Sequence, residues 1–368
     1  MAAASTRNQW LDICRSLAIS LVLLSHGRHF LTPAFPAAQN FKFGGFLGVE
    51  LFFVLSGFLI GGIILRSAEE SRSAVSWVPL FWTRRWLRTL PNYLLFLTIN
   101  IALAHSIRPA DLPNIFYYIT FTQSLAWQHP PFFGEAWSLA VEEIFYLLSP
   151  LLIAAFMYFG ATAEKAMLRT AMLVILTSTT LRILALILNN PTMDEGLRKI
   201  TVFRLDSIMF GVLAALLVKR YKEQTTIFRL AVGLSVIFFV CGYVASWPDS
   251  SLNESYAIRS SIFTMASLGG VGLVLLGITS KIRCNISFVT ERISRWSYSA
   301  YLANLPVLML LMKFKVPVTD SLSCIALFLA FIFLTFLVSA LVYKFFEAKI
   351  LRLRDKKFSE NIRTHVAQ

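Results

Sequence analysis

The sequence predicts an all-α, polytopic membrane protein. Of its 368 residues, 57% are hydrophobic and 15% are charged, and the mean hydropathy is +0.66. These values are typical of a chain that crosses a bilayer repeatedly. Apolar segments fill the chain almost from end to end, so any activity must reside in helices and short loops. The four cysteines are scattered without CxxC spacing, and we therefore expect neither a disulfide nor a metal site.

Ten membrane spans are predicted by a window of about 19 residues. They lie at about residues 10–30, 45–65, 90–106, 137–159, 166–188, 200–218, 228–247, 260–279, 297–312 and 322–346. The shorter apolar stretch 112–127 contains several polar residues and predicts an interfacial or re-entrant helix, with an eleventh span as the alternative. No repeat or Gly/Ser linker divides the chain. We therefore expect one domain over 1–368, with a helical core at about 8–346 and a basic cytoplasmic tail at 347–368.

The Lys and Arg residues are distributed unevenly between these spans. With the N-terminus placed in the cytoplasm, 23 of the 34 fall on the cytoplasmic side and eight on the opposite side. This positive-inside bias predicts an N-in, C-in topology, and it accounts for the net charge of +14 without nucleic acid as a partner. The eight outer residues are Arg28, Lys42, Arg108, Arg198, Lys199, Arg259, Lys313 and Lys315.

The first span contains ionisable residues on one face. Arg15 and His26 are eleven residues apart, which on a helix places them within about 20° on one stripe and about 16 Å apart along the axis. Asp12 lies about one turn before Arg15. Charged groups in a membrane are costly and rarely face lipid, so these residues predict a polar path through the bundle. Asp12 and Arg15 also interrupt the apolar core of any signal peptide, so we expect this segment to remain as a helix.

The second span, 45–65, combines small residues with one acid. Its glycines, among them Gly48 and Gly57, allow neighbouring helices to approach closely. Glu50 places a carboxylate near the outer end of the span. Two interpretations stay open for this acid: it belongs to a packing helix, or it has a function.

A basic cluster precedes the third span on the cytoplasmic side. Arg85 and Arg88 are three residues apart, hence on one helix face, and Arg84 is adjacent. Guanidinium groups bind phosphate oxygens through paired hydrogen bonds, so the cluster suits a phosphorylated ligand. The alternative is that these arginines, together with Trp82 and Trp86, anchor the helix to anionic lipid.

The fourth span carries two adjacent acids in an apolar helix. Ser138 and Glu142 are four residues apart on one face, Glu143 is adjacent, and Tyr146 lies one turn beyond Glu142. An acid in the membrane either pairs with a cation such as Arg15 or holds a proton. The pattern therefore favours a functional or ion-pairing role over simple packing.

Six motifs occur along the chain in a defined order. They are LDICRSLAISLVLLSH, GVELFFVLSGFLI, RRWLR followed by P-x-Y, WSLAVEEIFYLLSPLL, FRLDSIMFG and SYSAYLANLPV. In this order they resemble the acyltransferase-3 family, over about residues 8–346. Members of that family are bacterial integral-membrane O-acyltransferases that modify lipopolysaccharide O-antigen, peptidoglycan, exopolysaccharide and Nod factors. The chain looks like the stand-alone form, in which no periplasmic esterase-like domain follows residue 346.

The resemblance implies an activity. We expect transfer of an acyl group, expected to be acetyl, from cytoplasmic acetyl-CoA to a hydroxyl of a cell-surface or lipid-linked glycan such as O-antigen or exopolysaccharide. The expected location is the bacterial inner membrane, with membrane lipid around the helices. No metal is expected to take part.

The resemblance also implies roles for individual residues. His26 matches the histidine regarded as essential in the family, and Arg15 matches its partner arginine. A neutral imidazole is suited to take a proton from a sugar hydroxyl as that hydroxyl attacks a thioester. Glu142 or Asp12 is expected to orient His26 or to pair with Arg15.

The donor site and the acceptor site are implied in the same way. Arg85 and Arg88 match the R-x-x-R pair assigned to coenzyme A, with Arg84 beside them, and Ser138 with Glu142 matches the acid-bearing helix. The family usually has Asp where Glu50 stands, and often has His where Asn304 stands. Asn can hydrogen-bond but cannot take a proton at neutral pH, so a second catalytic histidine is not expected there. The residues expected to contact the acceptor are Glu50, Ser138, Glu143, Tyr146 and Asn304.

Two other classes of function stay open at this point. A proton-coupled transporter would also need buried Asp, Arg, His and Glu residues, although it has no evident use for Arg85 and Arg88. A non-catalytic membrane protein that binds lipid or glycan is the third possibility. Incorporation of label from acetyl-CoA into an extracted glycan distinguishes the enzyme from both.

Overall fold

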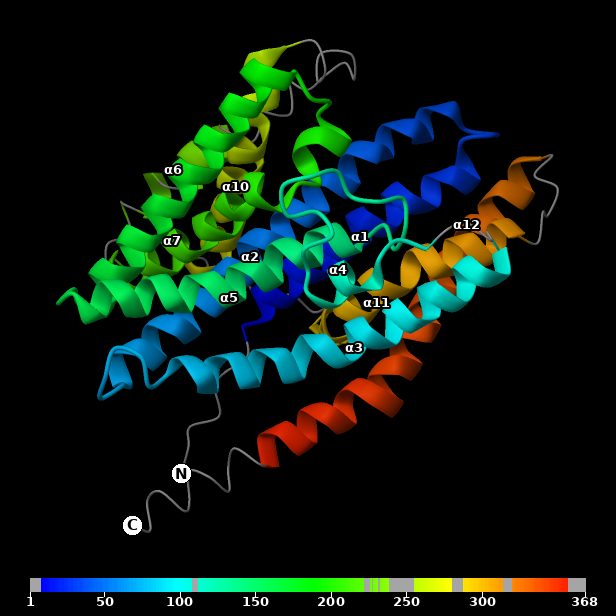
Figure 1. The fold of residues 1–368 in the computed structure, drawn as a ribbon. Helices are drawn as coiled ribbons and strands as arrows, with labels where there is room; N and C mark the ends of the chain where they lie inside the picture. The colour runs from blue at the N-terminus through cyan, green and yellow to red at the C-terminus, as the bar shows by residue number, and fades with distance from the viewer. Residues whose placement is uncertain are drawn as a thin grey trace.

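The computed structural model describes residues 8–107, 112–221, 226, 228–230, 232–237, 255–279, 287–313 and 320–356. In these ranges the chain forms helices and connecting loops, which confirms the predicted all-α class (Figure 1). The longer helices are α1 (Gln9–Leu31), α2 (Lys42–Glu70), α3 (Val78–Ile107), α5 (Ala136–Tyr158), α6 (Ala163–Asn189), α7 (Leu205–Tyr221), α10 (Tyr256–Thr279), α11 (Ser287–Lys313) and α12 (Ser321–Val342). The short elements are η1 (Pro36–Phe41), α4 (Ile115–Ile119), η2 (Asp194–Arg198), η3 (Thr201–Phe203) and η4 (Tyr343–Glu347).

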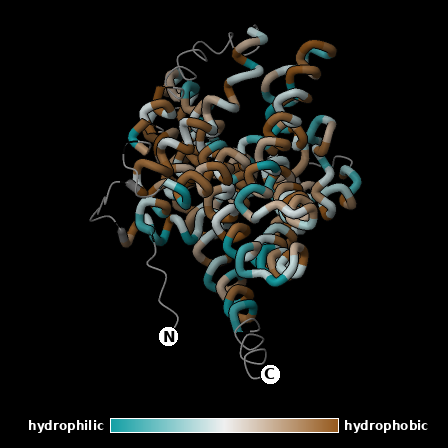
Figure 2. The backbone as a smooth tube through the Cα atoms, turned by 90° about the vertical axis from the view of Figure 1, so that its left-hand side faces the viewer, coloured by the Kyte–Doolittle hydropathy of each residue, from teal (hydrophilic) through white to brown (hydrophobic). Residues whose placement is uncertain are grey.

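Eight helices in the described ranges are long and apolar enough to cross a membrane, so the protein is a multi-pass membrane protein. The helix α11 covers the predicted span 297–312 but is not among the eight, because polar residues such as Ser297, Ser299 and Asn304 interrupt its apolar sequence. The predicted span 228–247 lies largely outside the described residues. Hydrophobic residues occupy most of the helical tube in Figure 2.

The segment 112–127 contains far less helix than expected. Its helix α4 has five residues, which at about 1.5 Å per residue cannot cross a hydrocarbon core of about 30 Å. The loop after α4 instead folds into the protein. The Gln123 amide donates to the carbonyl of Ala136 at 2.9 Å, and the backbone of Thr201 donates to Ser124 at 2.8 Å. The segment therefore connects α3 to α5 and rests against the chain before α7.

Helices α2 and α7 approach until their backbones touch. A Cβ atom added at Gly57 would lie 1.9 Å from the carbonyl oxygen of Ile208, and one added at Gly211 would lie 2.1 Å from the carbonyl oxygen of Val54. Only glycine fits at such a distance, which explains the small residues of the second span.

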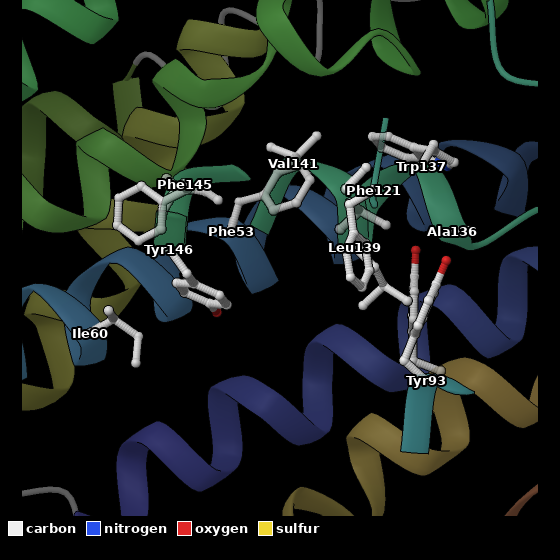
Figure 3. Close-up of a cluster of buried hydrophobic side chains, with 14 of the residues drawn as sticks. Phe53, Ile60, Tyr93, Phe121, Ala136, Trp137, Leu139, Val141, Phe145 and Tyr146 are labelled. Atoms are coloured by element: carbon white, nitrogen blue, oxygen red, sulfur yellow. The ribbon is translucent and has the colours of Figure 1, made fainter. Parts of the chain in front are cut away.

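An aromatic core joins α2, α3 and α5 (Figure 3). Phe53 packs edge-on against Trp137 with ring centroids 6.1 Å apart, and Tyr93 stacks on Phe133 at 5.5 Å. The Tyr93 hydroxyl donates to the carbonyl of Tyr118 at 2.8 Å, so α4 is attached to α3. This core holds α5 in position, and α5 carries the acids singled out in the sequence.

Candidate active site

Three cavities follow one another through the helix bundle. The first, here called the basic vestibule, has a volume of about 1130 Å³ and lies beside the end of α2 and the start of α3, on the side predicted to be cytoplasmic. Six guanidinium groups line it, against the two carboxylates of Glu70 and Asp355. The six are Arg66, Arg72, Arg84, Arg85, Arg88 and Arg354.

The second cavity, the inner cavity, is narrow, with a volume of about 120 Å³. It shares Ile60, Arg85 and Arg88 with the basic vestibule, so the two are neighbours. Its polar lining includes Arg15, Ser56, Ser138, Glu142, Tyr298 and Tyr301. The inner cavity thus brings Arg15, Arg85 and the fourth-span residues Ser138 and Glu142 to one place.

The third cavity, the outer cavity, has a volume of about 620 Å³ and is lined by His26, Glu135 and Trp137 among others. It shares Val49 and Tyr301 with the inner cavity. The Tyr301 hydroxyl and the Ser138 hydroxyl are hydrogen-bonded at 2.6 Å. Tyr301 therefore stands between the inner cavity and the outer cavity.

The hydrogen bonds of Asn304 determine which nitrogen of His26 carries a proton. The Asn304 side chain is fully buried, and its amide nitrogen donates to the carbonyls of Tyr301 at 2.5 Å and Ala300 at 3.3 Å. Its oxygen therefore faces His26, whose Nδ1 lies 2.5 Å away. An amide oxygen only accepts, so Nδ1 is the protonated nitrogen and Nε2 keeps the lone pair. His26 thus has the tautomer that a base acting through Nε2 requires.

In this arrangement neither Asp12 nor Glu142 contacts His26, whereas the alternative role expected for them, pairing with Arg15, stays a prediction. Asp12 is buried and accepts from the hydroxyl of Ser294 at 2.6 Å. It lies fourteen residues from His26 on α1, a separation of about 21 Å along a helix, so it cannot orient His26. Glu142 lines the inner cavity and not the outer cavity. Asn304, expected to contact the acceptor, is the residue that holds His26.

Arg15 and His26 also prove to belong to different cavities. Arg15 lines the inner cavity and His26 the outer cavity, although both lie on α1. The polar path predicted from the first span is therefore divided at Tyr301. Neither the spacing nor the helical face of the two residues could show this division.

The arginine and acid motifs meet around Tyr146. Arg85 donates to the Tyr146 hydroxyl, and its guanidinium carbon lies 4.2 Å from the centroid of the Tyr146 ring. The same hydroxyl donates to Glu142 at 3.2 Å and is hydrogen-bonded to Ser56 at 2.6 Å. Tyr146 is fully buried. It holds Arg85 at the junction of the basic vestibule and the inner cavity.

None of the five residues expected to contact the acceptor lines the outer cavity: Ser138 lines the inner cavity, and the other four line none of the three cavities. Glu50 forms a buried ion pair with Arg204 at 2.5 Å and accepts from Ser267 at 3.2 Å. A second buried pair joins Arg182 of α6 to Asp206 of α7 at 2.9 Å, and Asp206 follows Arg204 by two residues. Neither Glu50 nor the buried Glu143 lines any of the three cavities. For Glu50 the structure favours the packing interpretation, because its carboxylate is paired with Arg204, the residue immediately before α7, and does not line a cavity.

Glu135 was not expected from the sequence. It immediately precedes α5, its Oε1 accepts from the backbone of Leu305 at 3.1 Å, and its Oε2 is buried and has no hydrogen-bond partner. Burial raises the pKa of this carboxyl to about 8. It lines the outer cavity with His26. The one signal in the sequence was its position two residues before Trp137, where the WSLAVEE motif begins.

The fold and these cavities define a multi-pass membrane protein with a polar route through its helices, basic at one end and with a histidine towards the other. Residues 8–344 match the family described as Acyltransferase domain, and the chain belongs to this acyltransferase-3 family. This confirms the resemblance that the six motifs indicated.

Curated relatives carry related names. The chain is 24% identical over 349 residues to "O-acetyltransferase OatA" of Staphylococcus aureus, which covers 86% of this chain and 54% of that protein. It is 30% identical over 166 residues to "Peptidoglycan O-acetyltransferase OatA" of Listeria monocytogenes, a match that covers 40% of this chain and 24% of that protein. It is 28% identical over 162 residues to "Putative peptidoglycan O-acetyltransferase YrhL" of Bacillus subtilis, a match that covers 39% of this chain and 25% of that protein. The chain spans about half or less of the length of these relatives. No solved structure matches it.

Proposed function

We propose that this protein is a membrane O-acetyltransferase that moves an acetyl group from cytoplasmic acetyl-CoA to a hydroxyl of a cell-surface or lipid-linked glycan. The observation that carries this proposal is the series of three cavities, which leads from six arginines to His26. The names of the relatives favour a peptidoglycan-type acceptor over O-antigen. The proposed location is the bacterial inner membrane.

The basic vestibule and the inner cavity suit the two parts of acetyl-CoA. Six guanidinium groups around a wide cavity fit the phosphates of the nucleotide end, which guanidinium groups bind bidentately. The narrow inner cavity fits an unbranched arm that carries a thioester. In this proposal Arg85 and Arg88, which line both cavities, hold the donor where it enters the inner cavity.

The outer cavity supports the transfer step. The hydroxyl oxygen of the acceptor attacks the thioester carbonyl while Nε2 of His26 removes the hydroxyl proton. A carbon–oxygen bond forms, the carbon–sulfur bond breaks, and the departing sulfur takes the proton from His26, which leaves acetylated glycan and free coenzyme A. The bond from Nδ1 to Asn304 stabilises the imidazolium that exists between these proton transfers.

Transfer also requires the thioester to pass Tyr301. Because the Ser138–Tyr301 hydrogen bond lies between the inner and outer cavities, it must open for the acetyl group to reach His26. Opening one hydrogen bond between neutral groups costs about 1 kcal/mol, so thermal motion suffices.

The decisive experiment measures transfer of labelled acetyl from acetyl-CoA to extracted glycan by membranes that contain the His26→Ala protein. General-base assistance contributes about 10²–10⁴-fold in rate, so a loss of that size is expected, and complete loss would favour an acyl-histidine intermediate. His105→Ala is the matched control, since His105 is exposed at the end of α3 and lines none of the three cavities. Near-normal transfer by well-expressed His26→Ala protein would contradict the proposal.

A further inference from the structure

The basic tail predicted from the sequence begins as an ordered helix. After α12 the chain makes one π-helical turn, η4, and continues as a helix over residues 348–356, here called the tail helix. The helical stretch Ser321–Lys356 has 36 residues, which corresponds to about 54 Å of helix against a hydrocarbon core of about 30 Å. The tail helix, drawn in red in Figure 1, therefore extends beyond the span on the side predicted to be cytoplasmic.

A buried carboxylate attaches the tail helix to the bundle. Glu347, the residue directly before it, is 6% exposed, and its Oε2 accepts from the Asn92 amide at 2.7 Å and from the Ser299 hydroxyl at 2.9 Å. Asn92 belongs to α3 and follows Arg88 by about one helical turn. The start of the tail helix is therefore held close to the donor arginines of α3.

The tail helix forms part of the wall of the basic vestibule. Arg354 and Asp355 line this cavity together with the arginines at the start of α3. The other arginine of the tail helix, Arg352, is exposed and lines none of the three cavities. One arginine of the tail helix thus belongs to the vestibule and the other does not, although they are two residues apart.

Arg354 lies where the nucleotide end of the donor would be. Arg85 and Arg88 line both the vestibule and the inner cavity, whereas Arg354 lines the vestibule alone. A donor whose arm enters the inner cavity therefore places its pyrophosphate nearer to Arg85 and Arg88 and its ribose 3′-phosphate farther out.

The present partner of Arg354 does not prevent it from binding a phosphate. Arg354 forms an ion pair with Asp355 at 2.7 Å, and the Asp355 side chain is 68% exposed. An ion pair with one partner in solvent is weak. A phosphate monoester carries more charge than a carboxylate and accepts two parallel hydrogen bonds from a guanidinium group, so it can replace Asp355.

We propose that Arg354 binds the ribose 3′-phosphate of acetyl-CoA and that Glu347 is a positioning residue, which holds the tail helix at the wall of the vestibule. The proposal rests on the proposed function and adds the group by which the donor is recognised. Arg85 and Arg88 serve the pyrophosphate, which is also present in donors that lack the 3′-phosphate. Arg354 is the residue that distinguishes these donors from acetyl-CoA.

The test measures equilibrium binding of coenzyme A and of 3′-dephospho-coenzyme A to the intact protein in phosphatidylcholine vesicles. The wild type should bind coenzyme A roughly tenfold more tightly, as expected for one charge-assisted contact with a phosphate. Arg354→Gln should bind coenzyme A only as tightly as the dephospho form, with affinity for the dephospho form unchanged. Arg352→Gln is the matched control: it removes the same charge from the same helix and should keep the full preference.

Two further positions test the neighbours of Arg354. Asp355→Asn removes the competing carboxylate and should tighten coenzyme A binding roughly two- to fivefold. Glu347→Ala loses both hydrogen bonds of the carboxylate and should reduce the preference for coenzyme A, whereas Glu347→Gln keeps an acceptor oxygen and should restore it. A merely structural role of Glu347 would instead lower the affinity for both nucleotides equally.

The outcomes separate this proposal from the proposed function. Equal affinity of the wild type for the two nucleotides would overturn the proposal and leave the proposed function intact, and so would an unchanged preference in Arg354→Gln. An arginine that serves anionic lipid would give this same result. Unchanged or weaker binding by Asp355→Asn would show that the pair does not face the phosphate and would also overturn the proposal. The expected preference without acetyl transfer would refute the proposed function alone, and failure of either nucleotide to bind would refute both.

Discussion

Asn304 offers the sharpest test of the proposed chemistry. Its oxygen accepts from Nδ1 of His26 at 2.5 Å. In Asn304→Leu a side chain of similar size occupies the position without an acceptor. The imidazole can then adopt either tautomer, and the imidazolium loses its hydrogen bond. A hydrogen bond to a charged group contributes about 1.5–3 kcal/mol, which corresponds to a loss of roughly 10- to 150-fold in kcat.

The assay is acetyl transfer at saturating acetyl-CoA, compared with the same measurement in Asn304→Asp. The carboxylate retains an oxygen acceptor, so most of the rate should return. The KM for acetyl-CoA should stay unchanged in both variants, because the donor arginines lie at the other end of the route. A histidine at position 304 is not required for activity, and adding Asn304→His to the His26→Ala protein should not restore activity.

A double-mutant cycle shows whether Asn304 acts through His26. If it does, Asn304→Leu should cause little further loss in the His26→Ala background, because residues that work as a unit are not additive. A purely structural role would give the same fractional loss in both backgrounds. Full activity in a well-expressed Asn304→Leu protein would refute the reasoning.

Three further predictions concern the donor site, the division of the route and the buried acid. Alanine at both Arg85 and Arg88 should weaken acetyl-CoA binding by roughly tenfold or more. Lysine at these positions should restore binding only in part, because it lacks the two parallel hydrogen bonds of a guanidinium group. Unchanged acetyl-CoA affinity in the double alanine variant would exclude the donor site. Tyr301→Phe removes the hydrogen bond to Ser138. A cysteine that replaces Ser297 in the inner cavity should therefore react faster with an impermeant thiol reagent added from outside when Tyr301→Phe is also present. If this cysteine is completely inaccessible both with and without Tyr301→Phe, the result contradicts a passage at this point. Glu135 has a pKa of about 8 when folded against an ordinary value of 4.5, so its contribution to stability is present below pH 4.5 and is lost as the pH rises to 8. The melting temperature of Glu135→Gln should therefore rise relative to that of the wild type as the pH increases from 5 to 8. A constant difference between the two melting temperatures over this range would show that Glu135 is not a buried, protonated carboxyl.

Composition and motif order were sufficient for the class of protein and its family. Apolar segments of about 20 residues have no stable alternative to helices in a membrane, so the all-α multi-pass fold follows directly from hydropathy. The motifs are local in the sequence and identify the family without a structure. The pairing of Arg85 and Arg88 on one helix face is equally local, and both residues do line the basic vestibule.

Which side chains meet across different helices was decided only by the tertiary structure. Periodicity places His26 on a face of α1, but Asn304 is 278 residues away and reaches it only because α11 packs beside α1. Glu50 illustrates the converse, since a carboxylate that looked available in the sequence is taken by Arg204 of the segment before α7. Hydropathy constrains each helix separately, whereas contacts between helices depend on how all of them pack together, and that packing made Asn304 rather than Asp12 or Glu142 the partner of His26.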